Sequence, residues 1–192
     1  MVAALSLVVL WWFAPPGSRR PDGRMFFLGA GFMLLETKGV VHMALLFGST
    51  WVVNSVVFFA ILVMILLSNL TVLAIRPRRL GPAYALLIVA LLVNVLVPMR
   101  EFLALSGTAR VVASCAVTFL PIFFAGIIFA VSFRDNPHPD VAFGSNIAGA
   151  ILGGLSEFGS LMVGFNSLLV LAIGYYILSA ALTPRARGLA TG

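Results

Sequence analysis

The sequence predicts an all-α, polytopic transmembrane helical bundle, and three observations support this fold class. Hydrophobic residues make up 61% of the 192 residues and charged residues only 9%. The mean hydropathy is +1.13, whereas a soluble domain is about 45–50% apolar and about 25% charged. The apolar residues also form continuous runs, without the alternating segments of roughly ten residues that a transmembrane β-barrel requires.

Seven apolar segments are expected to be helices of a single transmembrane domain that covers residues 1–192. A bilayer core about 30 Å thick takes roughly 20 helical residues. The expected spans lie at residues 2–14, 25–47, 51–75, 82–99, 111–133, 141–163 and 165–182.

Proline, glycine and charge explain where these segments begin and end. The first is short and stops at Pro15 and Pro16, and no basic residue precedes it. A membrane anchor is therefore expected rather than a signal peptide; without this anchor the bundle has six spans. The third and fifth are long uninterrupted apolar runs. The fourth opens with Pro82, which is tolerated in a first helical turn. The sixth is rich in Gly, Ala and Ser.

The basic residues predict the orientation of the bundle. With seven spans, one side receives Arg19, Arg20, Arg24, Arg76, Arg78, Arg79, Arg134, Arg185 and Arg187. The other side receives Arg100 and Arg110, and Lys38 if its side chain snorkels there. Positive loops remain in the cytoplasm, so the N-terminus is expected outside and the C-terminus inside. This explains the net charge of +6 without a nucleic-acid partner.

The second segment carries charges near its centre, at Glu36 and Lys38, with His42 one turn beyond. An ionisable group at this depth is costly, so Glu36 is expected to be protonated, paired or in a wet cavity. Residues two apart on a helix point to different sides, so Glu36 and Lys38 meet only if Gly39 breaks the helix. Otherwise Lys38 snorkels outward towards His42.

Two interpretations of Glu36 stay open. In the first it lies on a proton or cation pathway or contacts a substrate. In the second it is a structural carboxyl that is hydrogen-bonded to another helix. Its candidate partners are Asn54, Asn94, Asn146 and Asn166. No metal site, catalytic residue or cofactor is expected, since the two histidines and the single cysteine are scattered.

The sixth segment carries a face of small residues. Ser145, Gly149 and Gly153 recur at intervals of four, with Gly154 alongside. Such faces let membrane helices approach closely. The role expected for these residues is therefore helix packing, while Glu157 is expected near the outer interface.

Four stretches carry a resemblance to a known family: "FFLGAGFMLLETKGV", "LFGSTWVVNSVVF", "LPIFFAGIIFA" and "NIAGAILGGLSEFGSLMVGFNSLLVLA". From Met25 to about Leu182 the chain resembles the membrane portion of bacterial spermidine-synthase-like integral membrane proteins. These fuse a transporter-like helical domain to an aminopropyltransferase-like Rossmann domain. The chain lacks that soluble domain, so no catalytic residue is carried over. The resemblance implies a multi-pass protein of the bacterial inner membrane.

Three functions compete on these grounds. The leading hypothesis is a non-enzymatic membrane subunit or scaffold that packs, through small-residue helix faces, with partner subunits or with copies of itself. The second is a small transporter or channel for a cation or polyamine that uses Glu36. The third is a membrane-embedded enzyme whose polar groups come from Glu36, His42 and the asparagines.

Overall fold

The computed structural model describes Val8 and residues 21–97, 99–164 and 166–183, and these residues form helices and connecting turns without a strand. The expected all-α fold class is therefore confirmed for this part of the chain. The helices are α2 (Gly23–Phe47), α3 (Trp51–Ile75), α4 (Gly81–Leu96), α5 (Met99–Ala104), α6 (Gly107–Arg134), α7 (Pro139–Val163) and α8 (Asn166–Ala181). Apart from Val8, the segment expected at 2–14 lies outside the described residues.

The helix bounds follow local sequence signals. Asp22 caps α2 by accepting a hydrogen bond from the Met25 N–H, and Thr50 caps α3 in the same way from Val53. Gly48 ends α2 with φ of 95°, a left-handed value that glycine adopts without strain. The segment expected at 82–99 ends early, because α4 stops at Leu96 and Val97 is extended. Val97 precedes Pro98, and a residue before proline is disfavoured in the helical conformation.

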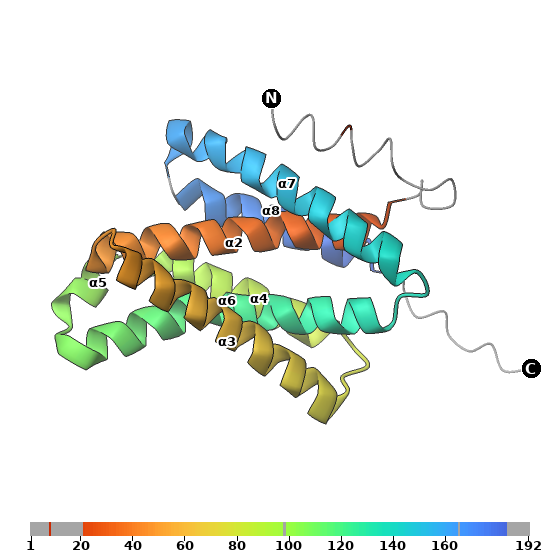
Figure 1. The fold of residues 1–192 in the computed structure, drawn as a ribbon, viewed down its shortest axis with the longest axis horizontal. Helices are drawn as coiled ribbons and strands as arrows, with labels where there is room; N and C mark the ends of the chain where they lie inside the picture. Colours follow the sequence, from red (N-terminus) through yellow and green to blue (C-terminus); the bar gives the residue numbers. More distant parts are fainter. Residues whose placement is uncertain (1–7, 9–20, 98, 165, 184–192) are drawn as a thin grey trace, which may run out of the picture.

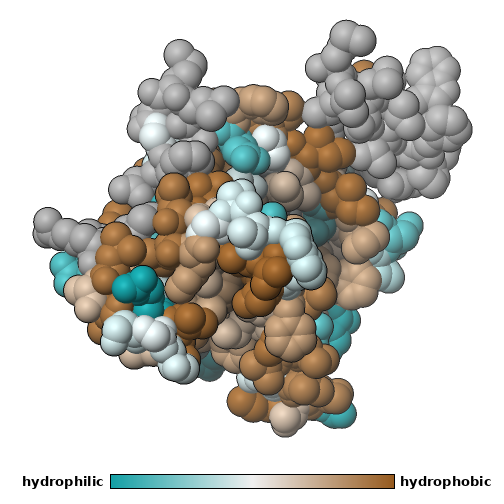
Figure 2. All heavy atoms as spheres, turned by 60° about the vertical axis from the view of Figure 1, so that its left-hand side comes forward, coloured by the Kyte–Doolittle hydropathy of each residue, from teal (hydrophilic) through white to brown (hydrophobic). Residues whose placement is uncertain are grey.

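Four of the described helices are long and apolar enough to cross a membrane, judged by length and composition: α2, α3, α6 and residues 139–158 of α7. The apolar helices α4 and α8 are shorter, at 16 residues each. Apolar side chains also dominate the surface in Figure 2, where hydrophilic residues form only small groups. On α3 the exposed side chains include Phe59, Leu62 and Leu66.

Helix α2 occupies the centre of the bundle (Figure 1), with α7 and α8 along one side and α3, α4 and α6 along the other. It contacts α7 most extensively, followed by α8 and α6. The long helices alternate in direction along the chain, so α2 and α7 run parallel. The buried core around α2 includes Leu34, Phe119, Ile122 and Tyr176.

Small residues let α2 and α7 approach each other closely. A Cβ atom at Gly29 would collide with the Asn146 carbonyl oxygen, and one at Gly149 would collide with the Phe26 carbonyl oxygen. At Gly153 the added atom would lie 2.5 Å from the Ala30 carbonyl oxygen. Backbone-to-backbone contact of this kind is how membrane helices associate when burial from water contributes little.

Candidate functional site

The candidate site is the polar segment of α2, which consists of Glu36, Thr37, Lys38 and His42. Helix α2 is continuous through Gly39, so no break brings Glu36 and Lys38 together. At about 1.5 Å per residue, Glu36 lies about 20 Å from the start of a helix about 38 Å long. The segment is therefore central along α2, and its side chains point to different neighbouring helices.

Thr37 points towards α7. Its Oγ1 donates a hydrogen bond of 3.3 Å to Oε2 of Glu157. The Glu157 carboxylate is therefore level with the middle of α2, and its expected position near the outer interface stays a prediction. Glu36, which is half-buried, immediately precedes Thr37. The structure thus brings carboxylates from two helices to the same level of the bundle.

His42 points towards α5, and Lys38 lies one turn before it on the same face of α2. Lys38 is buried, at 9% exposure, so the alternative in which it snorkels outward is not observed. The His42 ring packs edge-on against Phe102 of α5, with 5.8 Å between ring centroids. Buried His42 Nε2 and Thr118 Oγ1 find no hydrogen-bond partner within the described part of the chain. Buried polar atoms without a partner are uncommon in native proteins, and a functional role is one of the explanations for them.

The candidate asparagines bind backbone carbonyls. Asn94 Nδ2 donates to Val117 O at 2.5 Å and to Ala90 O at 3.2 Å, which links α4 to α6. Asn146 Nδ2 donates to Met25 O at 3.1 Å. Asn54 lies in the first turn of α3, and Asn166 begins α8. None of these hydrogen bonds reaches Glu36, so the asparagines act as links between helices or lie at helix ends.

The small residues of α7 divide into two groups. Gly149 and Gly153 pack against the α2 backbone of the same chain, and buried Ser145 accepts a hydrogen bond from the Asp22 N–H at 2.9 Å. Gly154 has no atom of another helix within 4 Å of an added Cβ. The packing role expected for Gly154 stays a prediction, whereas Ser145, Gly149 and Gly153 contact α2 or its capping residue. Their contacts are intramolecular.

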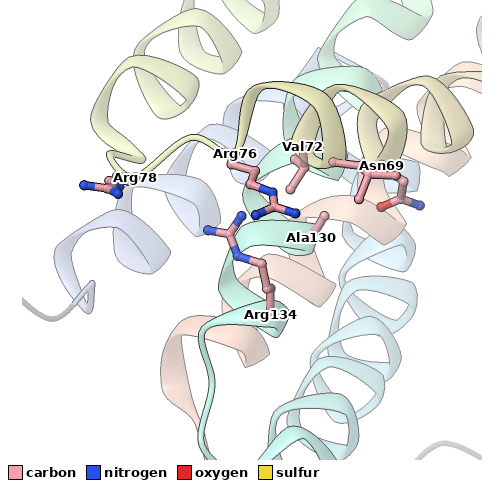
Figure 3. Close-up of a pocket in the computed structure, with 7 residues that line it drawn as sticks. Asn69, Val72, Arg76, Arg78, Ala130 and Arg134 are labelled. Carbon is pink, nitrogen blue, oxygen red and sulfur yellow. The ribbon is translucent and has the colours of Figure 1, made fainter.

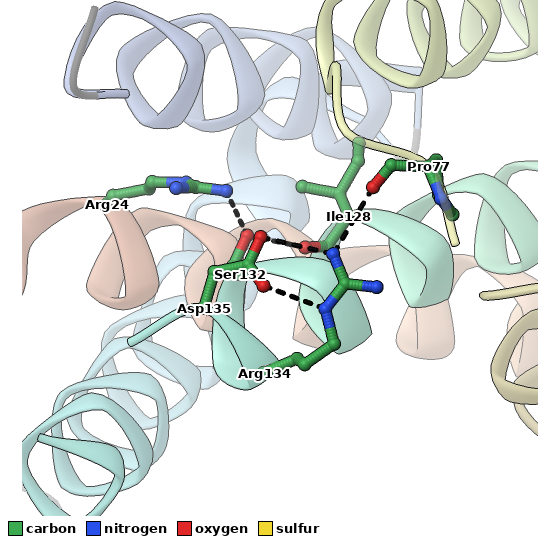
Figure 4. Close-up of polar contacts among 6 residues, drawn as sticks. All are labelled: Arg24, Pro77, Ile128, Ser132, Arg134 and Asp135. Carbon is green, nitrogen blue, oxygen red and sulfur yellow. Dashed lines mark hydrogen bonds and ion pairs between the residues drawn. The ribbon is translucent and has the colours of Figure 1, made fainter. Parts of the chain in front are cut away.

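A polar network at one end of the bundle was not expected from the sequence. Figure 4 shows Arg24 of α2 donating to Ser132 Oγ, which in turn donates to the Ile128 carbonyl oxygen. Arg134 donates from Nε to Asp135 Oδ1 at 2.7 Å and from Nη2 to Pro77 O at 3.2 Å. These contacts join the start of α2, the end of α6 and the α3–α4 loop.

Asp22 and Ser179 extend this network to α4, α7 and α8. Asn136 Nδ2 donates to Asp22 Oδ2 at 2.7 Å. Ser179 of α8 donates to the Arg24 carbonyl oxygen at 3.0 Å and shares a hydrogen bond of 2.8 Å with the Tyr84 hydroxyl of α4. The clustering of Arg24, Ser132 and Asn136 near helix ends was the available sequence signal, but only the packing shows which of them meet.

Asp135 is the ionisable group of this network that lies just beyond α6. The hydrogen bonds from the Arg134 guanidinium lower the pKa of Asp135 below its ordinary value, and the charges of Arg134 and Arg24 act in the same direction. The carboxylate therefore stays ionised into mildly acidic conditions. It offsets part of the positive charge at this end of the bundle.

The fold and this site define an all-helical protein with several apolar helices of membrane-spanning length. Among the described residues, no group of three or more His, Cys, Asp or Glu side chains is arranged to hold a metal ion. No family model, no curated protein and no solved structure matches the chain.

Proposed function

We propose that this chain is a multi-pass protein of the bacterial inner membrane that moves a cation across the bilayer, with Glu36 and Glu157 as its central carboxylates. The observation that carries the proposal is the hydrogen bond from Thr37 to Glu157. It brings a second carboxylate to the level of Glu36 on α2. Ionisable residues inside a membrane are costly, and they typically mark ion or substrate pathways.

The rest of the α2 segment supports the same proposal. Lys38 and His42 are buried on the side of α2 that faces α5. His42 Nε2 and Thr118 Oγ1, which have no partner among the described residues, are polar groups that a passing proton or a substrate amine can engage. The resemblance to spermidine-synthase-like membrane proteins makes a polyamine one candidate cation.

The proposed topology has seven spans, with the N-terminus outside and the C-terminus in the cytoplasm. Arg24, Arg76, Arg78, Arg79 and Arg134 lie at the end of the bundle where α2 begins and α3 and α6 end. Arg100 and Arg110 lie at the opposite end, in α5 and at the start of α6. The positive-inside rule assigns the arginine-rich end to the cytoplasm.

Uptake into proteoliposomes tests the proposal. Purified protein should accumulate a labelled monovalent cation or spermidine when an inside-negative potential is applied. Glu36→Gln and Glu157→Gln should each abolish this uptake, because both remove the ionisable carboxyl group and retain the shape. Asp140→Asn is the control: Asp140 is exposed in the first turn of α7, and its replacement should leave uptake unchanged. Equal uptake by the two glutamine variants and the unmodified protein would reject the role of the carboxylates.

A second candidate function is that of a non-enzymatic membrane subunit, and the exposed face of α3 favours it. Phe59, Leu62 and Leu66 are 68%, 64% and 57% exposed. The glycine face of α7 is occupied by α2, so the face of α3 is the surface this candidate would use for a partner subunit or a second copy. Mild extraction from native membranes, followed by mass measurement of the intact assembly, separates the two candidates. A solitary monomer would exclude the subunit.

A further inference from the structure

Arginine side chains surround a cleft between the end of α3 and the end of α6, which we call the arginine cleft. Its volume is about 530 Å³, and its walls include Asn69, Val72, Arg76, Arg78, Ala130 and Arg134. Figure 3 shows the guanidinium groups of Arg76 and Arg134 pointing towards each other across the cleft. Two like charges that face one another repel, and an anion between them would remove that repulsion.

The charges around the cleft favour a negatively charged ligand. Arg76, Arg78 and Arg134 are exposed. Asp135 neutralises part of the Arg134 charge through its bidentate contact, with distances of 2.7 and 3.1 Å. Guanidinium groups bind phosphate oxygens through charge-assisted hydrogen bonds, and the several oxygens of one phosphate group can accept from two facing arginines at once.

An apolar cavity shares Asn69 with the arginine cleft. A second hollow of about 190 Å³ is lined by Leu28, Phe32, Ile65, Asn69, Phe129 and Asn146. Asn69 lines both hollows, and Phe129 precedes Ala130 of the cleft on α6. The arginines lie at or just beyond the C-terminal ends of α3 and α6. The apolar lining residues of these helices lie further from those ends, towards the middle of the bundle. A ligand that fills both hollows has an anionic head and an apolar tail.

We propose that the arginine cleft and the apolar cavity together bind an anionic phospholipid, with its phosphate between Arg76 and Arg134 and an acyl chain against Phe32 and Phe129. Basic pockets between membrane helices on the cytoplasmic side are known to accept anionic lipid headgroups. The site is separate from the α2 polar segment: it rests on the proposed topology, which places it on the cytoplasmic side, and not on the proposed transport.

Native mass spectrometry of the protein in detergent tests the site, with phosphatidylglycerol as the probe. We expect one phosphatidylglycerol to bind at least fivefold more tightly than phosphatidylcholine of the same chain length. Glycerol phosphate and inorganic phosphate, which lack acyl chains, should not displace it at equal concentration. Displacement by either compound would identify a site for free anions and overturn the lipid assignment.

Variants locate the binding. Arg76 has φ of 49°, a left-handed value that favours glycine, so Arg76→Gly should remove the guanidinium and keep the helix end. We expect it to weaken phosphatidylglycerol binding about fivefold, the factor per basic residue at an anionic surface. Asp135→Asn should strengthen binding, because it removes the carboxylate next to Arg134. Arg110→Gln, at the opposite end of the bundle, is the control and should change nothing.

Two results would overturn the proposal. One is unchanged binding in Arg76→Gly with helical content equal to that of the unmodified protein. The other is an equal loss of binding in Arg110→Gln, which would show that net charge, and not the cleft, retains the lipid. If Arg76→Gly does not fold, the Asp135→Asn measurement decides, since unchanged or weaker binding there contradicts the site.

Discussion

Thr37 of α2 and Glu157 of α7 are joined by a hydrogen bond of 3.3 Å between Oγ1 and Oε2. The two residues are far apart in the sequence and lie on parallel helices whose backbones touch at Gly29, Gly149 and Gly153. The hydrogen bond between Thr37 and Glu157 therefore forms only because α2 and α7 pack closely together. Any change that separates the two helices should also disturb the carboxylate.

The first prediction concerns Thr37. Thr37→Val has nearly the same shape but removes the hydroxyl donor, so the Glu157 carboxylate loses one hydrogen bond. We expect a loss of about 1 kcal/mol in the free energy of unfolding, the typical net contribution of one intramolecular hydrogen bond. Thr37→Ser keeps the hydroxyl and is the matched control. Thermal unfolding in detergent measures both, and equal stability of the two variants would contradict the contact.

The second prediction separates two adjacent glycines of α7. Gly153→Val should destabilise the protein by about 3 kcal/mol or more, because the side chain meets the Ala30 backbone, and overpacking a tight contact costs about 1–3 kcal/mol even without backbone involvement. Gly154→Val adds the same side chain one residue away, into open space. Its effect on the unfolding midpoint in a denaturing detergent titration should be small. If Gly154→Val were the more destabilising of the two, α7 would have to be rotated about its own axis so that Gly154, and not Gly153, faces α2.

The third prediction uses two buried tyrosines. The Tyr84 hydroxyl shares a hydrogen bond of 2.8 Å with Ser179, so Tyr84→Phe should cost about 1 kcal/mol. The Tyr176 hydroxyl is buried without a partner in the described part of the chain, so Tyr176→Phe should be neutral or stabilising. Both substitutions remove one oxygen atom and nothing else. The unfolding temperatures of the two variants and the unmodified protein, measured in the same detergent, show which hydroxyl stabilises the fold.

The fourth prediction concerns the titration of Asp135. Because Arg134 donates hydrogen bonds to the ionised carboxylate, the pKa of Asp135 should lie below that of an ordinary aspartate. A depressed pKa in the folded state stabilises the fold above the ordinary pKa, and this contribution is lost as the pH falls through the depressed value. Arg134→Gln should raise the pKa of Asp135 towards its ordinary value. Carbon NMR of labelled aspartate in detergent micelles follows the titration, and an unshifted pKa in the unmodified protein would contradict the pairing.

Apolar run length and helix-end residues were sufficient to predict most of the secondary structure. The segment expected at 51–75 coincides with α3, and the one expected at 25–47 differs from α2 only by two residues at its start. Continuous apolar runs are local signals, and helix formation in such runs depends on local backbone hydrogen bonds. The end of α4 was missed because the effect of Pro98 on Val97 outweighs the hydropathy that continues to Met99.

By itself the sequence determined the fold class, the helices and the presence of costly charges in α2, because composition and helical periodicity are properties of the chain. Only the tertiary structure decided that Lys38 is buried, that Glu157 meets Thr37, that the α7 glycines face α2, and that Arg76 faces Arg134. These relationships depend on the rotation and spacing of helices that are distant in sequence. Side-chain packing across the whole bundle sets that rotation, and no single segment encodes it.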